Sequence, residues 1–177
     1  MNPVLRQLED ELSRSLSGLT APNAQLHPRQ NSTRWNIYQI VRHLLLTYAS
    51  TASSIEVRLA KGLPTRSRST PSQLLAKIVV IHMGLLPSGR EAPGIVMPPA
   101  EPPDPSPSGD ILASEVTASL TCMDAILTGA ERHFSTTPCL SHFALGPLSI
   151  PQWRRFHLVH GRHHIRQILA IRREYRF

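Results

Sequence analysis

The sequence predicts an all-α protein, a helical bundle in a single domain spanning residues 1–177, and two observations carry this prediction. Apolar residues recur at helical spacing in five segments, most of which open on a recognisable helix-capping residue. Between these segments, no stretch alternates apolar and polar residues as a half-buried strand does. A chain of 177 residues, of which 41% are hydrophobic, is long and apolar enough to bury one core.

The first two expected helices have clear beginnings and ends. Asn2 is followed directly by proline, which is typical of a helix start, and leucines then recur at helical spacing as far as Gly18. The second helix opens at Asn36, which is spaced from Gln39 as in a capping box. It is expected to end near Lys61, because glycine and proline follow closely.

The last three expected helices follow the same logic. Capping boxes open the third and the fifth: Thr70 with Gln73, and Ser149 with Gln152. The third helix is short and ends near Gly84. The fourth covers about residues 110–133, where apolar residues again form one stripe, and the fifth extends to about Arg173.

Residues 87–109 form a proline-rich segment, which we call the strap. It holds eight of the sixteen prolines, so an extended, polyproline-like conformation is expected. The simpler interpretation is a crossover connection between helices. The alternative is a lid over the opening of a site.

Four histidines lie within eight residues of the fifth helix, between His157 and His164. His160 and His164 are one turn apart, so their imidazoles leave the same helix face and one metal ion can reach both. On a helical wheel this face also carries large apolar residues, whereas the arginines fall on the far side. A buried imidazole needs a polar partner, so we expect His160 and His164 to bind a metal. His157 and His163 are flanking candidates.

His43, on the second helix, is the best third ligand, because a row of small polar residues beside it is typical of a cavity wall. Three imidazoles suit a divalent metal such as zinc or nickel, and they leave a coordination position open for chemistry. Gln167 lies one turn beyond His164, so Gln167 and His157 are expected to orient a ligand or contact substrate rather than bind metal. The sequence identifies no general base. The reactive group would be a metal-bound water or thiolate.

Several motifs resemble those of the DinB-like superfamily of metalloenzymes. They are Trp35-Asn36-Ile37 with Arg42-His43-Leu44, Gly146-Pro147-Leu148-Ser149 leading to Trp153, and the run from His160 to Ile168. The resemblance implies a four-helix bundle, usually dimeric, whose metal is held at positions matching His43, His160 and His164. It also implies thiol-dependent S-transferase, isomerase or hydrolase activity. The strap and the extra short helix depart from the family pattern.

The leading functional hypothesis is therefore a metal-dependent enzyme acting on a small molecule. It is either a thiol S-transferase that uses a low-molecular-weight thiol as cosubstrate, or a hydrolase. The alternatives are a protein that binds metal without catalysis and a structural or interaction module of the same fold. The open coordination position favours an enzyme.

The remaining features limit the partners and the compartment. The net charge is +7, but the seventeen arginines are scattered along the chain, so nucleic acid is not an expected partner. The N-terminal segment lacks the apolar core of a signal peptide, and no apolar run approaches the roughly 18 residues of a membrane span. A cytoplasmic protein that does not bind membranes is expected. Cys122 and Cys139 are expected to be free thiols.

A homodimer is expected from a second apolar row on the fifth helix. Leu158, Ile165 and Leu169 lie on the side opposite His160. An isolated bundle would expose such a row to water, and exposed apolar rows commonly mark a partner surface. The competing explanation is intramolecular, with the short third helix or the strap covering the row.

Overall fold

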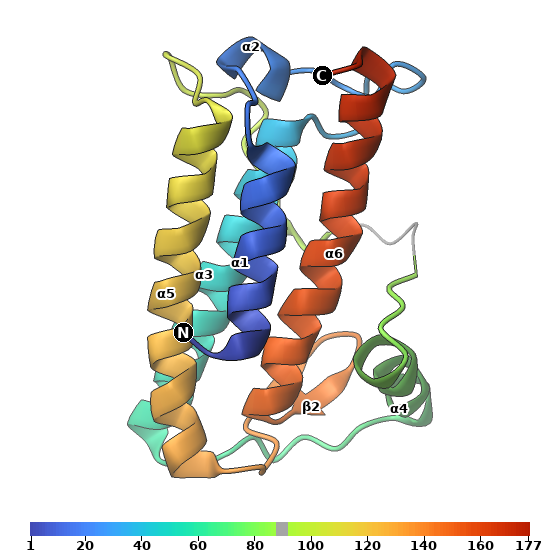
Figure 1. Ribbon diagram of the computed structural model, residues 1–177. Helices are drawn as coiled ribbons and strands as arrows, with labels where there is room; N and C mark the ends of the chain where they lie inside the picture. The colour runs from blue at the N-terminus through green and yellow to red at the C-terminus, as the bar shows by residue number, and fades with distance from the viewer. Residues whose placement is uncertain (88–91) are drawn as a thin grey trace.

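The computed structural model describes residues 1–87 and 92–177, and it confirms the all-α prediction (Figure 1). Within these residues, four long helices form a bundle: α1 (Pro3–Leu16), α3 (Ile37–Lys61), α5 (Gly109–Phe134) and α6 (Ile150–Tyr175). α1 packs against α5 and α6, and α3 also packs against α5 and α6. The core between them consists mainly of leucine, isoleucine and valine side chains.

The helices begin where the capping residues predict. The Asn2 side chain accepts a hydrogen bond from the backbone of Val4, and proline follows at the first helical position. All three expected capping boxes form: Asn36 with Gln39, Thr70 with Gln73, and Ser149 with Gln152. α3 ends at Gly62, whose φ of 63° lies in the left-handed region that glycine favours.

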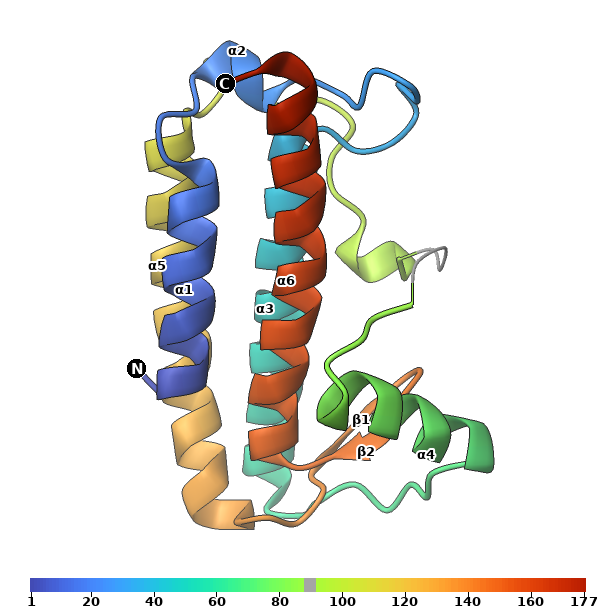
Figure 2. The same cartoon turned by 45° about the vertical axis from the view of Figure 1, so that its right-hand side comes forward.

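Smaller elements lie outside the bundle. α2 (Ala21–Ala24) follows α1, and α4 (Pro71–Lys77) continues into a π-helical turn, η1 (Ile78–His82). A short 3₁₀ turn, η2 (Gly94–Val96), lies in the strap. In Figure 2, α4 stands to one side of the bundle, next to the hairpin described below.

The expectation that no strands occur is wrong. β1 (Leu140–His142) and β2 (Gly146–Leu148) form an antiparallel hairpin in which Leu140 pairs with Leu148. Each strand has only three residues, which is too short for a polar–apolar alternation to show in the sequence. Gln73 and Lys77 of α4 donate hydrogen bonds to the carbonyls of Phe143 and Pro147, so the hairpin and α4 are joined.

The described part of the strap runs along the bundle beside α3 and connects the η1 region to α5 (Figure 2). Residues 88–91, at its start, lie outside the described residues. The Gln39 amide donates a 3.1 Å hydrogen bond to the carbonyl of Ala100, and Val96 is buried. The strap is thereby held against the start of α3.

The apolar row expected at a dimer interface is largely covered within the chain. Leu158 and Ile165 are 1% and 8% exposed, and only Leu169 is open to solvent, at 41%. The same side of α6 carries Gly161, where an added Cβ would lie 2.3 Å from a methyl carbon of Leu8. α1 therefore packs on this side of α6. The row is no evidence for a dimer, and the homodimer stays a prediction.

α5 is the one described helix with the length and hydropathy of a membrane-spanning helix. Its apolar stripe, including Leu112, Val116 and Leu120, is buried in the bundle against α1 and α3. It also carries the acids Asp124 and Glu131, which pair with Arg154 of α6. α5 therefore packs into the bundle through this apolar stripe and these ion pairs.

Candidate metal centre

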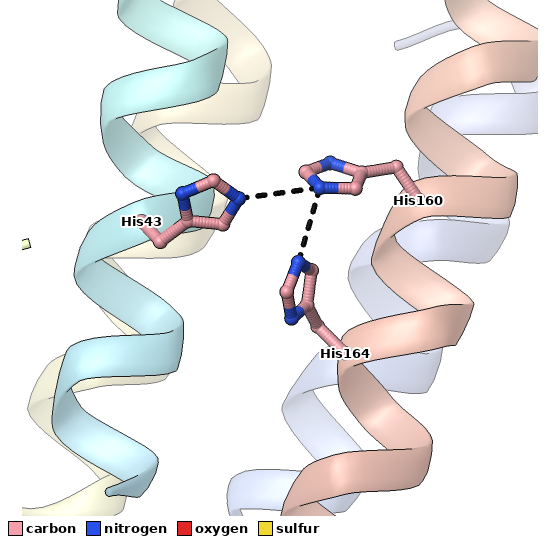
Figure 3. A group of neighbouring side chains, drawn as sticks. All are labelled: His43, His160 and His164. Atoms are coloured by element: carbon pink, nitrogen blue, oxygen red, sulfur yellow. Dashed lines mark hydrogen bonds between the residues drawn. The ribbon is translucent and has the colours of Figure 1, made fainter. Parts of the chain in front are cut away.

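Three histidines from two helices meet beside the bundle core, as Figure 3 shows. His43 comes from α3, and His160 and His164 come from successive turns of α6. The Nε2 atom of His160 lies 3.2 Å from Nε2 of His43 and 3.0 Å from Nε2 of His164. All three residues are buried, and one ligand atom from each lies within 4.8 Å of the others. The structure thus brings together the three residues predicted as ligands.

Hydrogen bonds at Nδ1, the ring nitrogen that faces away from the cluster, determine the tautomers of His43 and His164. Nδ1 of His43 lies 2.8 Å from the carbonyl oxygen of Val96, and Nδ1 of His164 lies 2.8 Å from Oε1 of Gln167. Both oxygens can only accept, so each Nδ1 carries the proton. Both Nε2 atoms therefore direct lone pairs toward His160.

The resulting arrangement fits a cation. Two Nε2 lone pairs point at His160, but a single proton on Nε2 of His160 can satisfy only one of them. A divalent ion accepts lone pairs from all three nitrogens at once. Nδ1 of His160 then carries the proton, and this buried atom has no hydrogen-bond partner among the described residues. An unpaired N–H of this kind costs about 1–3 kcal/mol, which metal binding would offset.

Burial keeps these imidazoles neutral. It lowers the pKa of His43, lowers the pKa of His160 well below 6.5, and lowers the pKa of His164 to about 3. The neighbouring histidines add to the effect at His160 and His164, because each opposes a positive charge on the others. The neutral form is the one that binds a metal ion, so the site is prepared for binding at neutral pH.

Two of the three accessory candidates lie beside the cluster. His163 and Gln167 both line the cavity next to the cluster. The Gln167 amide connects them: its oxygen accepts from His164, and its nitrogen lies 3.2 Å from Nε2 of His163, to which it donates. Gln167 is thus placed to orient His164.

His157 does not have the position expected of a substrate-contacting residue. Its ring is fully buried, packs edge-on against Tyr48 at 5.4 Å, and is not part of the cavity lining. Neither ring nitrogen has a hydrogen-bond partner in the part of the chain that the structure describes. Burial lowers its pKa to about 3. The position differs because α6 is buried on more than one side, so a wheel position near His160 does not imply access to the site.

A cavity of about 1100 Å³ opens beside the three histidines. The small polar row of α3 lines one wall, as the sequence predicts, through Thr47, Ser50 and Ser54. The strap forms another part of the wall, through Pro93, Ile95 and Val96. The volume suits a small-molecule substrate, with the histidine cluster exposed to it.

Sequence reasoning missed three neighbours of the centre. The Val96 carbonyl that orients His43 has no signature, because any residue offers a backbone carbonyl. The Trp35 ring lies 4.9 Å from the ring of His43, although the motif that contains Trp35 suggests only a helix start. His142 lines the cavity from the hairpin, and its ring lies 4.5 Å from that of Phe156. Its place depends on the hairpin, which the sequence does not predict.

Comparison with known families agrees with this geometry. The family model of the DinB superfamily matches residues 5–168, which include all three clustered histidines. A search of curated proteins found no match, and a search of solved structures found none.

Proposed function

Because this chain belongs to the DinB superfamily, we propose that it is a metal-dependent enzyme that joins a low-molecular-weight thiol to a small electrophile. Its cofactor would be one divalent ion, zinc or nickel, held by Nε2 of His43, His160 and His164. The observation that carries the proposal is the convergence of these three neutral nitrogens beside a cavity. Membership of the DinB superfamily and the geometry of the three-histidine cluster both fit a metal-binding protein.

A divalent ion with three imidazole ligands and an open position supplies a Lewis acid that lowers the pKa of a bound thiol or water. The protein residues supply the rest. Val96 and Gln167 hold two of the rings in the tautomer that leaves Nε2 available. The bundle core behind the cluster excludes water from its inner side, because His160 is only 8% exposed.

Within the described part of the chain, no carboxylate lies beside the three histidines, and this favours thiol transfer over hydrolysis. Among the described residues that line the cavity, Glu174 is the only acid, and it belongs to the last turns of α6. A thiolate attacks without a general base, whereas water activation usually uses one. In the proposed step the thiol proton is lost to solvent and a sulfur–carbon bond forms. The bond to the leaving group breaks, and its electron pair departs with that group.

Hydrolysis is the second candidate, and one observation favours it. His163 lines the cavity beside His164 and receives a hydrogen bond from the Gln167 amide. An imidazole at this place can accept the proton of an attacking water when its Nε2 lone pair is released from the Gln167 amide. The same cavity argues against a purely structural protein, because it gives small molecules access to the cluster.

A conjugation assay tests the proposal. Zinc- and nickel-loaded protein is mixed with 1-chloro-2,4-dinitrobenzene and either glutathione or cysteine, and thioether formation is followed by absorbance. We expect metal-dependent acceleration that His160→Ala abolishes. Metal-dependent hydrolysis of 4-nitrophenyl acetate with no conjugation would support the second candidate. No metal-dependent rate in either assay would contradict an enzyme of these two classes.

Two further expectations remain proposals. The chain forms a homodimer, which light scattering at micromolar concentration tests, and a monomer would contradict it. The protein is cytoplasmic, which fractionation of the source cells tests.

A further inference from the structure

The cavity beside the histidine cluster extends toward α4 and the hairpin, and this part of its wall is apolar. Leu75 of α4 and Val79 of η1 line it on one side. Leu145 of the hairpin connection and the aromatic rings of Trp153 and Phe156, from the start of α6, line it on the other. A ligand that binds in this part of the cavity displaces water mainly from apolar side chains, which favours binding of an apolar ligand.

The wall formed by α3 is polar but uncharged. It carries Thr47, Ser50, Thr51 and Ser54. The Thr47 hydroxyl donates to the carbonyl of His43 in its own helix, at 2.8 Å. Hydroxyl groups of this kind can accept or donate a hydrogen bond but cannot neutralise an ionic group.

The fixed charges that the described residues bring to the cavity lie at its other end. Among its described lining residues, the side chains with a formal charge are Arg34 and Glu174. Arg34 precedes α3 and Glu174 lies near the end of α6, whereas α4 and the hairpin lie where α6 begins (Figure 2). An ionic group in the half next to α4 would have no countercharge among the described lining residues, and burying an unpaired charge costs several kcal/mol.

The entrance to this half is also apolar. Leu75, Ile95 and Phe143 all line the cavity, yet they are 64%, 76% and 63% exposed. They come from α4, the strap and the hairpin, three segments that border the same cavity. Large apolar side chains grouped at a cavity mouth are typical of a binding site for apolar molecules.

We infer that the electrophilic substrate is a neutral, largely apolar molecule that enters over Leu75, Ile95 and Phe143 and lies between α3 and α4. Its apolar body contacts Val79, Trp153 and Phe156, and an uncharged polar atom faces the hydroxyl row of α3. The inference rests on the proposed function, because it names the substrate class of that centre.

A matched pair of fluorescent probes tests this inference. N-phenyl-1-naphthylamine is neutral, and 8-anilinonaphthalene-1-sulfonate has the same ring system with one sulfonate. We expect the neutral probe to bind at least tenfold more tightly, with one probe per chain. Val79→Arg, on the cavity wall, should weaken its binding at least tenfold. Leu74→Arg should change binding less than twofold, because Leu74, on the adjoining helix α4, is 50% exposed and does not line the cavity.

A second variant is needed because Val79→Arg could misfold the η1 turn. Ser50→Phe fills the cavity from α3, and it should also weaken binding of the neutral probe at least tenfold. Equal or tighter binding of the sulfonate at a site sensitive to Ser50→Phe would overturn the inference. Equal loss in Leu74→Arg would also overturn it and would place the probe on the outer face of α4.

Metal content and probe binding are measured separately on the same samples. The neutral probe should bind the metal-free and the zinc-loaded protein equally tightly, because the residues proposed to contact it are not metal ligands. If conjugation activity is absent but probe binding follows the expected pattern, the proposed function fails and the apolar site stands. If activity is present but the neutral probe does not bind, the substrate class is wrong.

Discussion

Replacing Gln167 with leucine should weaken metal binding without abolishing it. Oε1 of Gln167 accepts the Nδ1 proton of His164 at 2.8 Å, and His164 is only 6% exposed. Without this acceptor, the ring either leaves a buried N–H unpaired, at a cost of about 1–3 kcal/mol, or moves the proton to Nε2 and blocks the lone pair. Removing the partner of a metal-binding histidine typically costs about 10–100-fold in affinity.

Competition with a chromogenic zinc chelator at pH 7.5 measures this effect. We expect the dissociation constant for zinc to rise about 10–100-fold in Gln167→Leu, equivalent to about 1.4–2.7 kcal/mol. Gln167→Glu is the matched control, because it keeps an oxygen acceptor at the same position and should bind at least as tightly as the unsubstituted protein. Unchanged affinity in Gln167→Leu would refute the orienting role. A loss as complete as that of His164→Ala would make Gln167 a ligand.

Two further predictions concern stability. The pKa of His157 is lowered to about 3 in the folded state, so below pH 6.5 the unfolded chain binds a proton that the folded chain does not. Stability is therefore lost as the pH falls, by about 2 kcal/mol between pH 7 and 5 for this residue, and urea unfolding of the metal-free protein should show a smaller loss in His157→Leu. Gly109→Ala should destabilise the protein by about 3 kcal/mol or more, because its Cβ would lie 2.1 Å from the carbonyl oxygen of Leu16. Gly129→Ala, in open space on the same helix, should instead stabilise it by up to about 1 kcal/mol. An unchanged pH dependence in His157→Leu, or similar effects of the two alanines, would contradict these arguments.

Helix boundaries follow from the sequence because the interactions that determine them are local. The capping box of Asn36 and Gln39, for example, joins residues three positions apart. The paired ligands His160 and His164 are equally local, since one helical turn separates them. His43 comes from a different helix, and only its polar neighbours and the family resemblance indicate its place.

The incorrect predictions depend on contacts that the sequence does not encode locally. A helical wheel assumes one buried face, but α6 packs on α1 as well as facing the cavity, so Leu158 and Ile165 are buried. Arg154, one of the arginines on the far side of the same wheel, is 3% exposed because Asp124 and Glu131 of α5 lie across from it. The hairpin is held by hydrogen bonds from α4, a partner far away in the sequence.

The metal content of the purified chain tests whether the three histidines bind an ion. Elemental analysis should find up to one divalent ion per chain in the unsubstituted protein and in His157→Leu, whose ring lies outside the cluster. His43→Ala, His160→Ala and His164→Ala should each lose it and should no longer be stabilised by added zinc, since an ion bound only to the folded state raises stability. Undiminished metal in His160→Ala or His164→Ala, or no stabilisation of the unsubstituted protein by any divalent ion, would contradict a metal centre.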